Sequence, residues 1–159
     1  MIITHASSER IEEVKSSVFY APFFKGCLFF ASEGNEYNLA GECHYQYNLE
    51  VNNIIEVESF FSHHDITEAA VQQVISMVRD DLEIEVSDEE IAALLDNSES
   101  IRDFEFSGYD DAGEADWAIQ QYQGILSHKL GYDCAQSSDE QGTVYIAYCV
   151  GREMKEVEC

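Results

Sequence analysis

The amino-acid sequence predicts an α+β fold within one domain of 159 residues. Segments rich in β-branched and aromatic residues lie near both ends of the chain, and segments with helical periodicity lie between them. We expect the strands from the two ends to meet in one sheet, because a strand buries its apolar face only against other elements. A chain of this length buries roughly 68–70% of its unfolded surface, which is enough for a core without metals.

The N-terminal third of the sequence predicts four strands and one short helix. Gly26 precedes the second strand, and the Asn52–Asn53 pair is a turn signal ahead of the fourth. The predicted strands are residues 2–5, 27–32, 45–51 and 54–57, and residues 35–42 favour the helix.

The middle of the chain predicts two helices. Apolar residues recur at helical spacing over 66–78, behind an Asp65–Glu68 pair that has the spacing of a capping box. Ser87 and Glu90 form a true S-x-x-E box ahead of the next apolar run.

The C-terminal part predicts a third helix and two strands. Asp116 is the predicted N-cap of a helix over 117–130, and Gly131 is expected to end this helix in the left-handed conformation. The charged tail from Gly151 is expected to fray. The strands are predicted at residues 134–136 and 143–148.

The charge of the chain is strongly one-sided, with 32 acidic against 8 basic residues and a net charge of −24. Residues 80–116 hold 15 of the acidic residues and a single basic one, Arg102. At one charge per roughly 1.7 Å, that number of carboxylates matches about 25 Å of DNA duplex. A solvated helical face is the simpler explanation of a charge run. Because the excess is so one-sided, we expect a basic protein partner and no direct binding to nucleic acid or membranes.

The sequence predicts neither an export signal nor a metal site. Its first residues lack the basic region of a signal peptide, and no stretch approaches the roughly 20 apolar residues of a membrane span. The five cysteines form no C-x-x-C motif, so we expect reduced thiols in a cytoplasmic protein. The residues from Asp110 to Glu114 lack the spacing of a calcium-binding loop, and the histidines form no H-x3-H pair.

The strongest local chemical signal is the pair Asp139–Glu140 directly before an apolar strand. Because side chains alternate along a strand, the two carboxylates are expected to face opposite ways, so that one of them enters a given pocket. An ordinary polar turn is the alternative interpretation. His5 ends the first strand and precedes Ala6 and Ser7, small residues that let a ligand approach the backbone. A lone histidine more often has a structural role.

The aromatic-rich segment 19–30 exceeds what one short strand needs. Most of its rings must lie in the core, and one or two of them could stack on a flat heteroaromatic ligand. No G-x-G-x-x-G or P-loop motif is present, which excludes a Rossmann or Walker phosphate site.

The order and spacing of these motifs resemble the type I-F anti-CRISPR ADP-ribosyltransferase family. The resemblance is good from Trp117 to Thr143, weaker over residues 1–50, and not detected in the acidic middle. The motifs that carry it are His5-Ala6-Ser7, Gly26 to Ser32, Trp117 with Gln120, Leu130-Gly131-Tyr132, and Asp139-Glu140 with Gly142-Thr143.

The resemblance implies a split, two-sheet ADP-ribosyltransferase-like core over residues 1–159, with an acidic helical insert at about 62–116. It implies an NAD-dependent mono-ADP-ribosyltransferase, with Asp139 as the essential acid and Glu140 beside it. The residues that it places along the NAD cleft are His5, Ala6, Ser7, Phe23, Gly26, Leu28, Phe29 and Phe30. Where this chain has Ala6 the family commonly has glycine, so a methyl group is added near the dinucleotide.

The expected partner is a DNA-binding Cas subunit of a type I CRISPR complex in the host bacterial cytoplasm, whose modification prevents target DNA binding. The alternative is a non-catalytic acidic DNA mimic that occupies the same basic surface, and a third possibility is a toxin-type host target. The enzymatic interpretation requires that the Asp139 carboxylate lies across a narrow pocket from His5.

Overall fold

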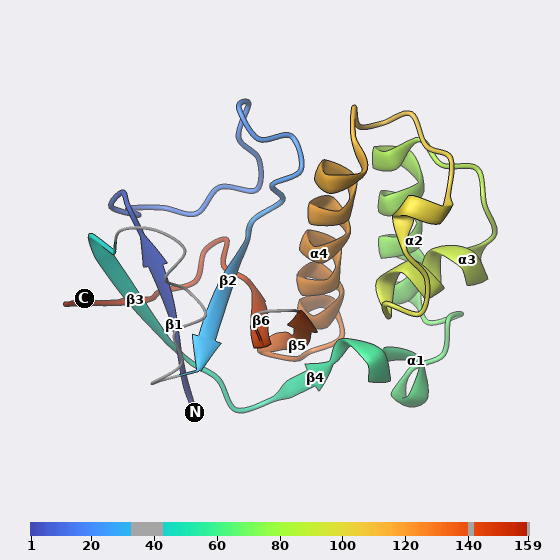
Figure 1. The fold of residues 1–159 in the computed structure, drawn as a ribbon. Coiled ribbons are helices and arrows are strands. Elements are labelled where there is room, and N and C mark those ends of the chain that lie inside the picture. The colour runs from blue at the N-terminus through green and yellow to red at the C-terminus, as the bar shows by residue number, and fades with distance from the viewer. Residues whose placement is uncertain (33–42, 140–141, 159) are drawn as a thin grey trace.

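The computed structural model describes residues 1–32, 43–139 and 142–158, which form a sheet with helices packed on one face (Figure 1). The described strands lie in the order β4-β5-β6-β2-β1-β3-β7. They are β1 (Ile2–Ser7), β2 (Cys27–Ser32), β3 (Tyr45–Glu50), β4 (Ile54–Glu56), β5 (Cys134–Asp139), β6 (Gly142–Tyr148) and β7 (Lys155–Val157). The helices are η1 (Val57–Ser59), α1 (Phe60–His63), α2 (Ala69–Leu82), α3 (Asp88–Leu95), η2 (Ile101–Asp103) and α4 (Ala112–Lys129). In this part of the chain, none of the helices has the length and apolar character of a membrane span.

Strand β2 joins the two halves of the sheet. Its first four residues pair antiparallel with β6, from Cys27 opposite Tyr148 to Phe30 opposite Tyr145. Its pairing with β1 is limited to Ala31 and Ser32. The strands from the two ends of the chain therefore meet in one sheet, and the predicted α+β class is confirmed.

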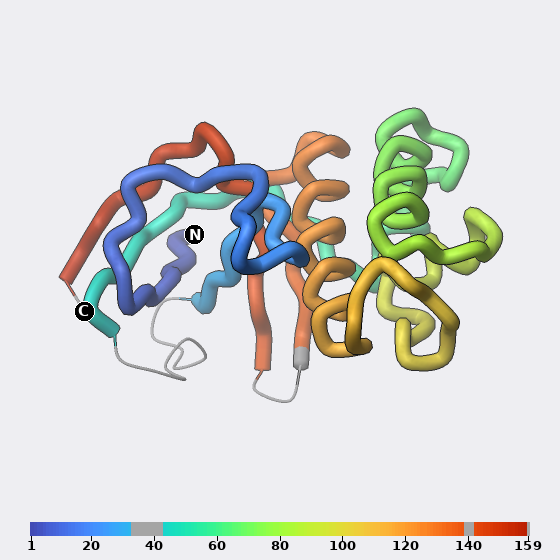
Figure 2. Tube along the Cα trace, turned by 90° about the horizontal axis from the view of Figure 1, so that it is seen from above, coloured from blue at the N-terminus to red at the C-terminus, as the bar shows by residue number. Residues whose placement is uncertain are grey.

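The two faces of the sheet are covered by different segments. Helix α4 packs on one face, with α2 and α3 outside it (Figures 1 and 2). At Gly124 the approach is so close that a Cβ atom would lie 2.6 Å from Cys27 Sγ. The opposite face is covered by the segment between β1 and β2, which buries Val14 against Ile3 and Phe30. This second covering segment forms the cavity described below.

The structure confirms one of the two helix starts predicted for the middle of the chain and moves the other. The Ser87–Glu90 capping box is confirmed, with both of its hydrogen bonds present. Helix α2, in contrast, begins at Ala69 and not near residue 66, because Asp65 and Glu68 bond to backbone N–H groups in the turn before it.

Helix α4 begins earlier than predicted. Its N-cap is Asp111, which accepts a hydrogen bond from the Glu114 N–H, and the predicted cap Asp116 instead lies inside the helix and accepts from Gln120. The small residues before Trp117 carry little apolar periodicity, so their helical state was not evident from the pattern. Gly131 follows the helix at φ +94°, as predicted.

Two further expectations are wrong, and one lies outside the described residues. The C-terminal tail does not simply fray, because Lys155–Val157 pairs with β3. Cys27, Cys134 and Cys149 are free thiols, but Cys43 is disulfide-bonded, so the reduced state does not extend to every cysteine. The helix predicted for residues 35–42 falls outside the described ranges.

Candidate active site

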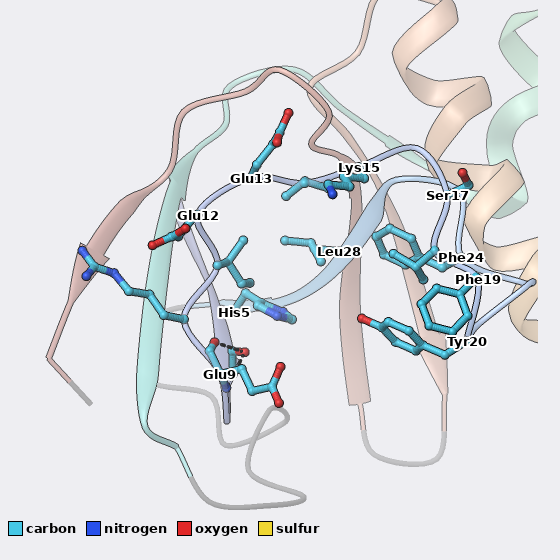
Figure 3. Close-up of a pocket in the computed structure, with 15 residues that line it drawn as sticks. His5, Glu9, Glu12, Glu13, Lys15, Ser17, Phe19, Tyr20, Phe24 and Leu28 are labelled. Carbon is cyan, nitrogen blue, oxygen red and sulfur yellow. Dashed lines mark hydrogen bonds between the residues drawn. The ribbon is translucent and has the colours of Figure 1, made fainter.

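A cavity of about 780 Å³ lies between strands β1 and β2 and the segment that connects them (Figure 3). The two strands contribute His5, Ser7 and Leu28, and the connecting segment contributes the remaining lining. That remaining lining consists of Glu9, Arg10, Ile11, Glu12, Glu13, Val14, Lys15, Ser17, Val18, Phe19, Tyr20 and Phe24.

His5 is held in one orientation at the strand side of this cavity. Its Nδ1 lies 2.7 Å from the Phe29 carbonyl oxygen, and its ring centroid lies 5.7 Å from that of Phe30. A carbonyl only accepts hydrogen bonds, so Nδ1 carries the proton and Nε2 is an acceptor. Burial lowers the pKa of His5 below its usual value, although the bond to Phe29 opposes this shift. His5 therefore presents a neutral imidazole at neutral pH.

The connecting segment concentrates basic residues that are scarce elsewhere. Arg10, Lys15 and Lys25 are three of the eight basic residues in the chain, and the first two line the cavity. Arg10 Nε lies 3.3 Å from Glu156 Oε1, but both side chains are well exposed, so this pair is weak. The same segment also lines the cavity with the carboxylates of Glu9, Glu12 and Glu13, so the two cations leave the lining with a formal charge of −1.

Two aromatic rings stand exposed at the mouth of the cavity. Phe19 is 97% exposed and Tyr20 is 75% exposed, and their rings meet edge to face with centroids 5.5 Å apart (Figure 3). Phe24, from the same segment, also lines the cavity. Rings that water surrounds in this way are suited to stack on a flat ligand.

Gln121 on α4 bonds the connecting segment to the start of β2, and it is not among the site residues predicted from the sequence. Its Oε1 accepts from the backbone N–H groups of Lys25 and Cys27, at 3.0 and 2.9 Å, and its Nε2 donates to the Cys27 carbonyl at 3.0 Å. The side chain is 1% exposed. A signal was present, because Gln121 stands at helical spacing from Ala118 and Ile125 on the apolar face of the helix.

A second anchor comes from α2. Asp81 accepts from the Lys25 ammonium at 3.1 Å and from the Tyr109 hydroxyl at 2.5 Å. The same hydroxyl lies 3.3 Å from the Pro22 carbonyl. Burial and the carboxylate of Asp81 both raise the pKa of Tyr109, so this hydroxyl keeps its proton and acts as a donor.

The predicted cleft residues divide between the two faces of the sheet. His5, Ser7 and Leu28 line the cavity, and Phe30 is buried beside His5. Phe23 and Phe29 pack instead with the helices, where their ring centroids lie 5.1 and 6.4 Å from that of Trp117. Two further predicted residues are placed by their backbone: Gly26 has φ +106° just before β2, and Ala6 pairs with Gln46 of β3.

The described site residues that were predicted lie on β1, on β2 and just before it, and on β5, and β6 separates β5 from β2. Asp139 is the last residue of β5, and its backbone pairs with Gly142. Three interstrand spacings separate β5 from β1, a lateral distance of about 14 Å. Glu140 lies outside the described residues. Among the residues that are described, no group of three or more His, Cys, Asp or Glu side chains could hold a metal ion.

Comparison with known proteins identifies the class of this molecule as an anti-CRISPR ADP-ribosyltransferase. The model of the family Anti-CRISPR Type I-F ADP-ribosyltransferase AcrIF11 matches residues 1–156, and the chain belongs to this family. The family that the sequence resembles and the predicted ADP-ribosyltransferase activity are thereby confirmed. Enzymes of this class use NAD as their co-substrate.

One solved structure gives independent support for the fold. It is described as the crystal structure of an anti-CRISPR protein, and it is similar to this chain with a TM-score of 0.58 and 23% sequence identity. The match covers 99% of this chain and 95% of that chain. No curated protein matches the sequence.

Proposed function

We propose that this protein transfers ADP-ribose from NAD to a DNA-binding subunit of a type I CRISPR complex, which then no longer binds target DNA. The observation that carries the proposal is the large cavity at His5 in a chain that belongs to an anti-CRISPR ADP-ribosyltransferase family. The proposal treats residues 1–159 as one ADP-ribosyltransferase-like domain with an acidic insert at about 62–116. In this interpretation β2 is the strand at which the core divides.

The residues around the cavity suit NAD. Its volume of about 780 Å³ falls within the roughly 300–1,000 Å³ typical of ligand pockets. Arg10 and Lys15 can pair with a diphosphate, in competition with the three glutamates of the lining, and the Nε2 of His5 can accept a hydrogen bond from a ribose hydroxyl. Tyr20 can stack on a heteroaromatic ring at the mouth.

The chemistry breaks the bond between ribose C1′ and the nicotinamide nitrogen, and the acceptor side chain forms the new bond to C1′ as it loses a proton. Positive charge develops on the sugar, as in glycoside hydrolysis. We assign its stabilisation to Asp139, with Glu140 beside it. One preorganised group of this kind lowers a barrier by about 3–4 kcal/mol, or 10²–10³ in rate.

The acidic insert is proposed to steer the enzyme to its partner. Exposed carboxylates from Asp80 to Asp111 form a strongly acidic surface in which Arg102 is the one basic residue, and such surfaces accelerate association with a basic partner by about 10–10³. The same surface favours the second candidate function, a DNA mimic that blocks the complex by occupancy alone.

The deciding experiment incubates a purified type I-F surveillance complex with NAD and a tenth of its molar amount of this protein. Intact mass should show one ADP-ribosyl group on most copies of a DNA-binding subunit. Asp139→Asn should abolish the modification, and Asp103→Asn, the same change at an exposed site in the insert, should not. A DNA mimic needs one copy for each complex and does not respond to NAD. Labelling of other host proteins alone would indicate the toxin-type target.

A further inference from the structure

A second, smaller hollow lies at the start of α4, on the helix-covered face of the sheet. It has a volume of about 270 Å³ and is lined by Phe23, Asp111, Gly113, Glu114 and Trp117, here called the Trp117 site. Trp117 is 53% exposed although it is a large apolar side chain. The edge of Phe23 meets its ring at an interplanar angle of 80°, which fixes the orientation of the indole.

The Trp117 site combines an aromatic face with negative charge. Asp111 and Glu114 line it, and the exposed Asp110 precedes Asp111 in the chain. The N-terminus of α4 contributes only about half a positive charge, so the two carboxylates that line the hollow outweigh it. Cations bind over an indole face within about 6 Å of the ring centroid, and a planar guanidinium both stacks on the ring and bonds to carboxylates.

We propose that the Trp117 site binds an arginine side chain of the protein that is modified. This inference rests on the proposed function, because it names the recognition surface of the same enzyme. Phe23 and Phe24 are adjacent in the chain but pack on opposite sides, Phe23 against Trp117 and Phe24 in the cavity at His5. A partner held at Trp117 therefore lies beside the segment that covers the reaction cavity, which also exposes Phe19 and Tyr20.

The test uses Trp117 as its own reporter, since it is the single tryptophan of the chain. The full-length protein is titrated with a hexa-arginine peptide, and the tryptophan emission is recorded. We expect a saturable change in emission, with a lower half-saturating concentration than for hexalysine. Asp111→Asn combined with Glu114→Gln should raise this concentration about tenfold, since two exposed ion pairs are lost. Asparagine is as good an N-cap as aspartate, so the helix start is retained.

The matched control is Glu99→Gln combined with Asp103→Asn, which removes the same two charges from exposed positions in the acidic segment. It should change the half-saturating concentration less than twofold. Equal weakening in the two double variants would show only general charge attraction and would overturn the proposal. An emission that does not respond to the peptide would overturn it as well.

The titration uses neither NAD nor a CRISPR complex, so its outcome is independent of the transferase assay. If the protein modifies the complex but the titration fails, this inference falls and the proposed function stands. If the titration succeeds but no subunit is modified, the proposed function falls instead.

Discussion

Replacing Gln121 with leucine tests how the cavity is held in place. β1 pairs with only the last two residues of β2, so the backbone of Cys27 has no strand partner on that side. The Gln121 amide takes the place of the missing strand, with an acceptor for the Cys27 N–H and a donor for its carbonyl. Leucine has a similar volume but supplies neither group.

The size of the effect follows from these bonds. The two Cys27 groups are buried, and each buried polar group that loses its partner costs about 1–3 kcal/mol. The loss is therefore about 2–6 kcal/mol, and the additional apolar burial of leucine offsets roughly 1–2 kcal/mol of it. We expect a net loss of about 3 kcal/mol in the free energy of unfolding. For a chain of this length this lowers the Tm by about 6–12 °C.

The measurement is urea denaturation together with thermal unfolding of wild type, Gln121→Leu and Gln120→Leu. Gln120 is the control on the same helix, because among the described residues its side chain bonds to Asp116 alone, at 3.0 Å. Its replacement should cost less than about 1 kcal/mol. If the two leucine variants lose the same stability, the side chain of Gln121 does not substitute for a strand and the reasoning is refuted.

Three further perturbations have defined outcomes. The pKa of His5 is lowered in the folded state, so the native protein binds fewer protons than the unfolded chain, and the unfolding free energy should fall as pH drops below about 6.5. Denaturation from pH 7.5 to 5 should show a smaller fall in His5→Gln, and identical slopes would contradict this. Tyr109→Phe should lower the free energy of unfolding by about 1.5–3 kcal/mol, because the Tyr109 hydroxyl bonds to the Asp81 carboxylate. Tyr20→Phe, at an exposed position, should leave the free energy of unfolding unchanged in the same urea assay. Gly124→Ala should lower the Tm despite the better helix propensity of alanine, since its Cβ would lie 2.6 Å from Cys27 Sγ. Overpacking of this kind costs about 1–3 kcal/mol. An unchanged Tm would contradict this and show that α4 can move away from β2.

The sequence predicted those elements whose signals are local. Residues 27–32 and the box at Ser87 need only a short window, and both agree with the structure. The predictions failed where a competing local bond decided the outcome, as at Asp65, where side chains bond within a turn and delay the helix.

The candidate site was predicted only in part, because it is assembled by contacts distant in sequence. His5, Ser7 and Leu28 could be proposed from strand-end patterns and the family resemblance, and all three line the cavity. The covering segment 8–26 has no periodicity that shows which face of the sheet it packs on. Its anchor, Gln121, is 94 residues from Cys27, and no short window relates the two.

The distribution of charge connects the two binding functions that we propose. A protein with a net charge of −24 would repel a dinucleotide, whose diphosphate is itself anionic. Arg10 and Lys15 reduce this repulsion locally, because they offset two of the three glutamates that line the cavity and act within a screening length of about 8–10 Å. The acidic helices α2 and α3 pack on the other face of the sheet. Gln121 and Asp81 hold the segment that bears these cations on the sheet. The same chain can thus present a strongly acidic surface to a basic protein with its helices, and a much less acidic one to NAD with the segment between its first two strands.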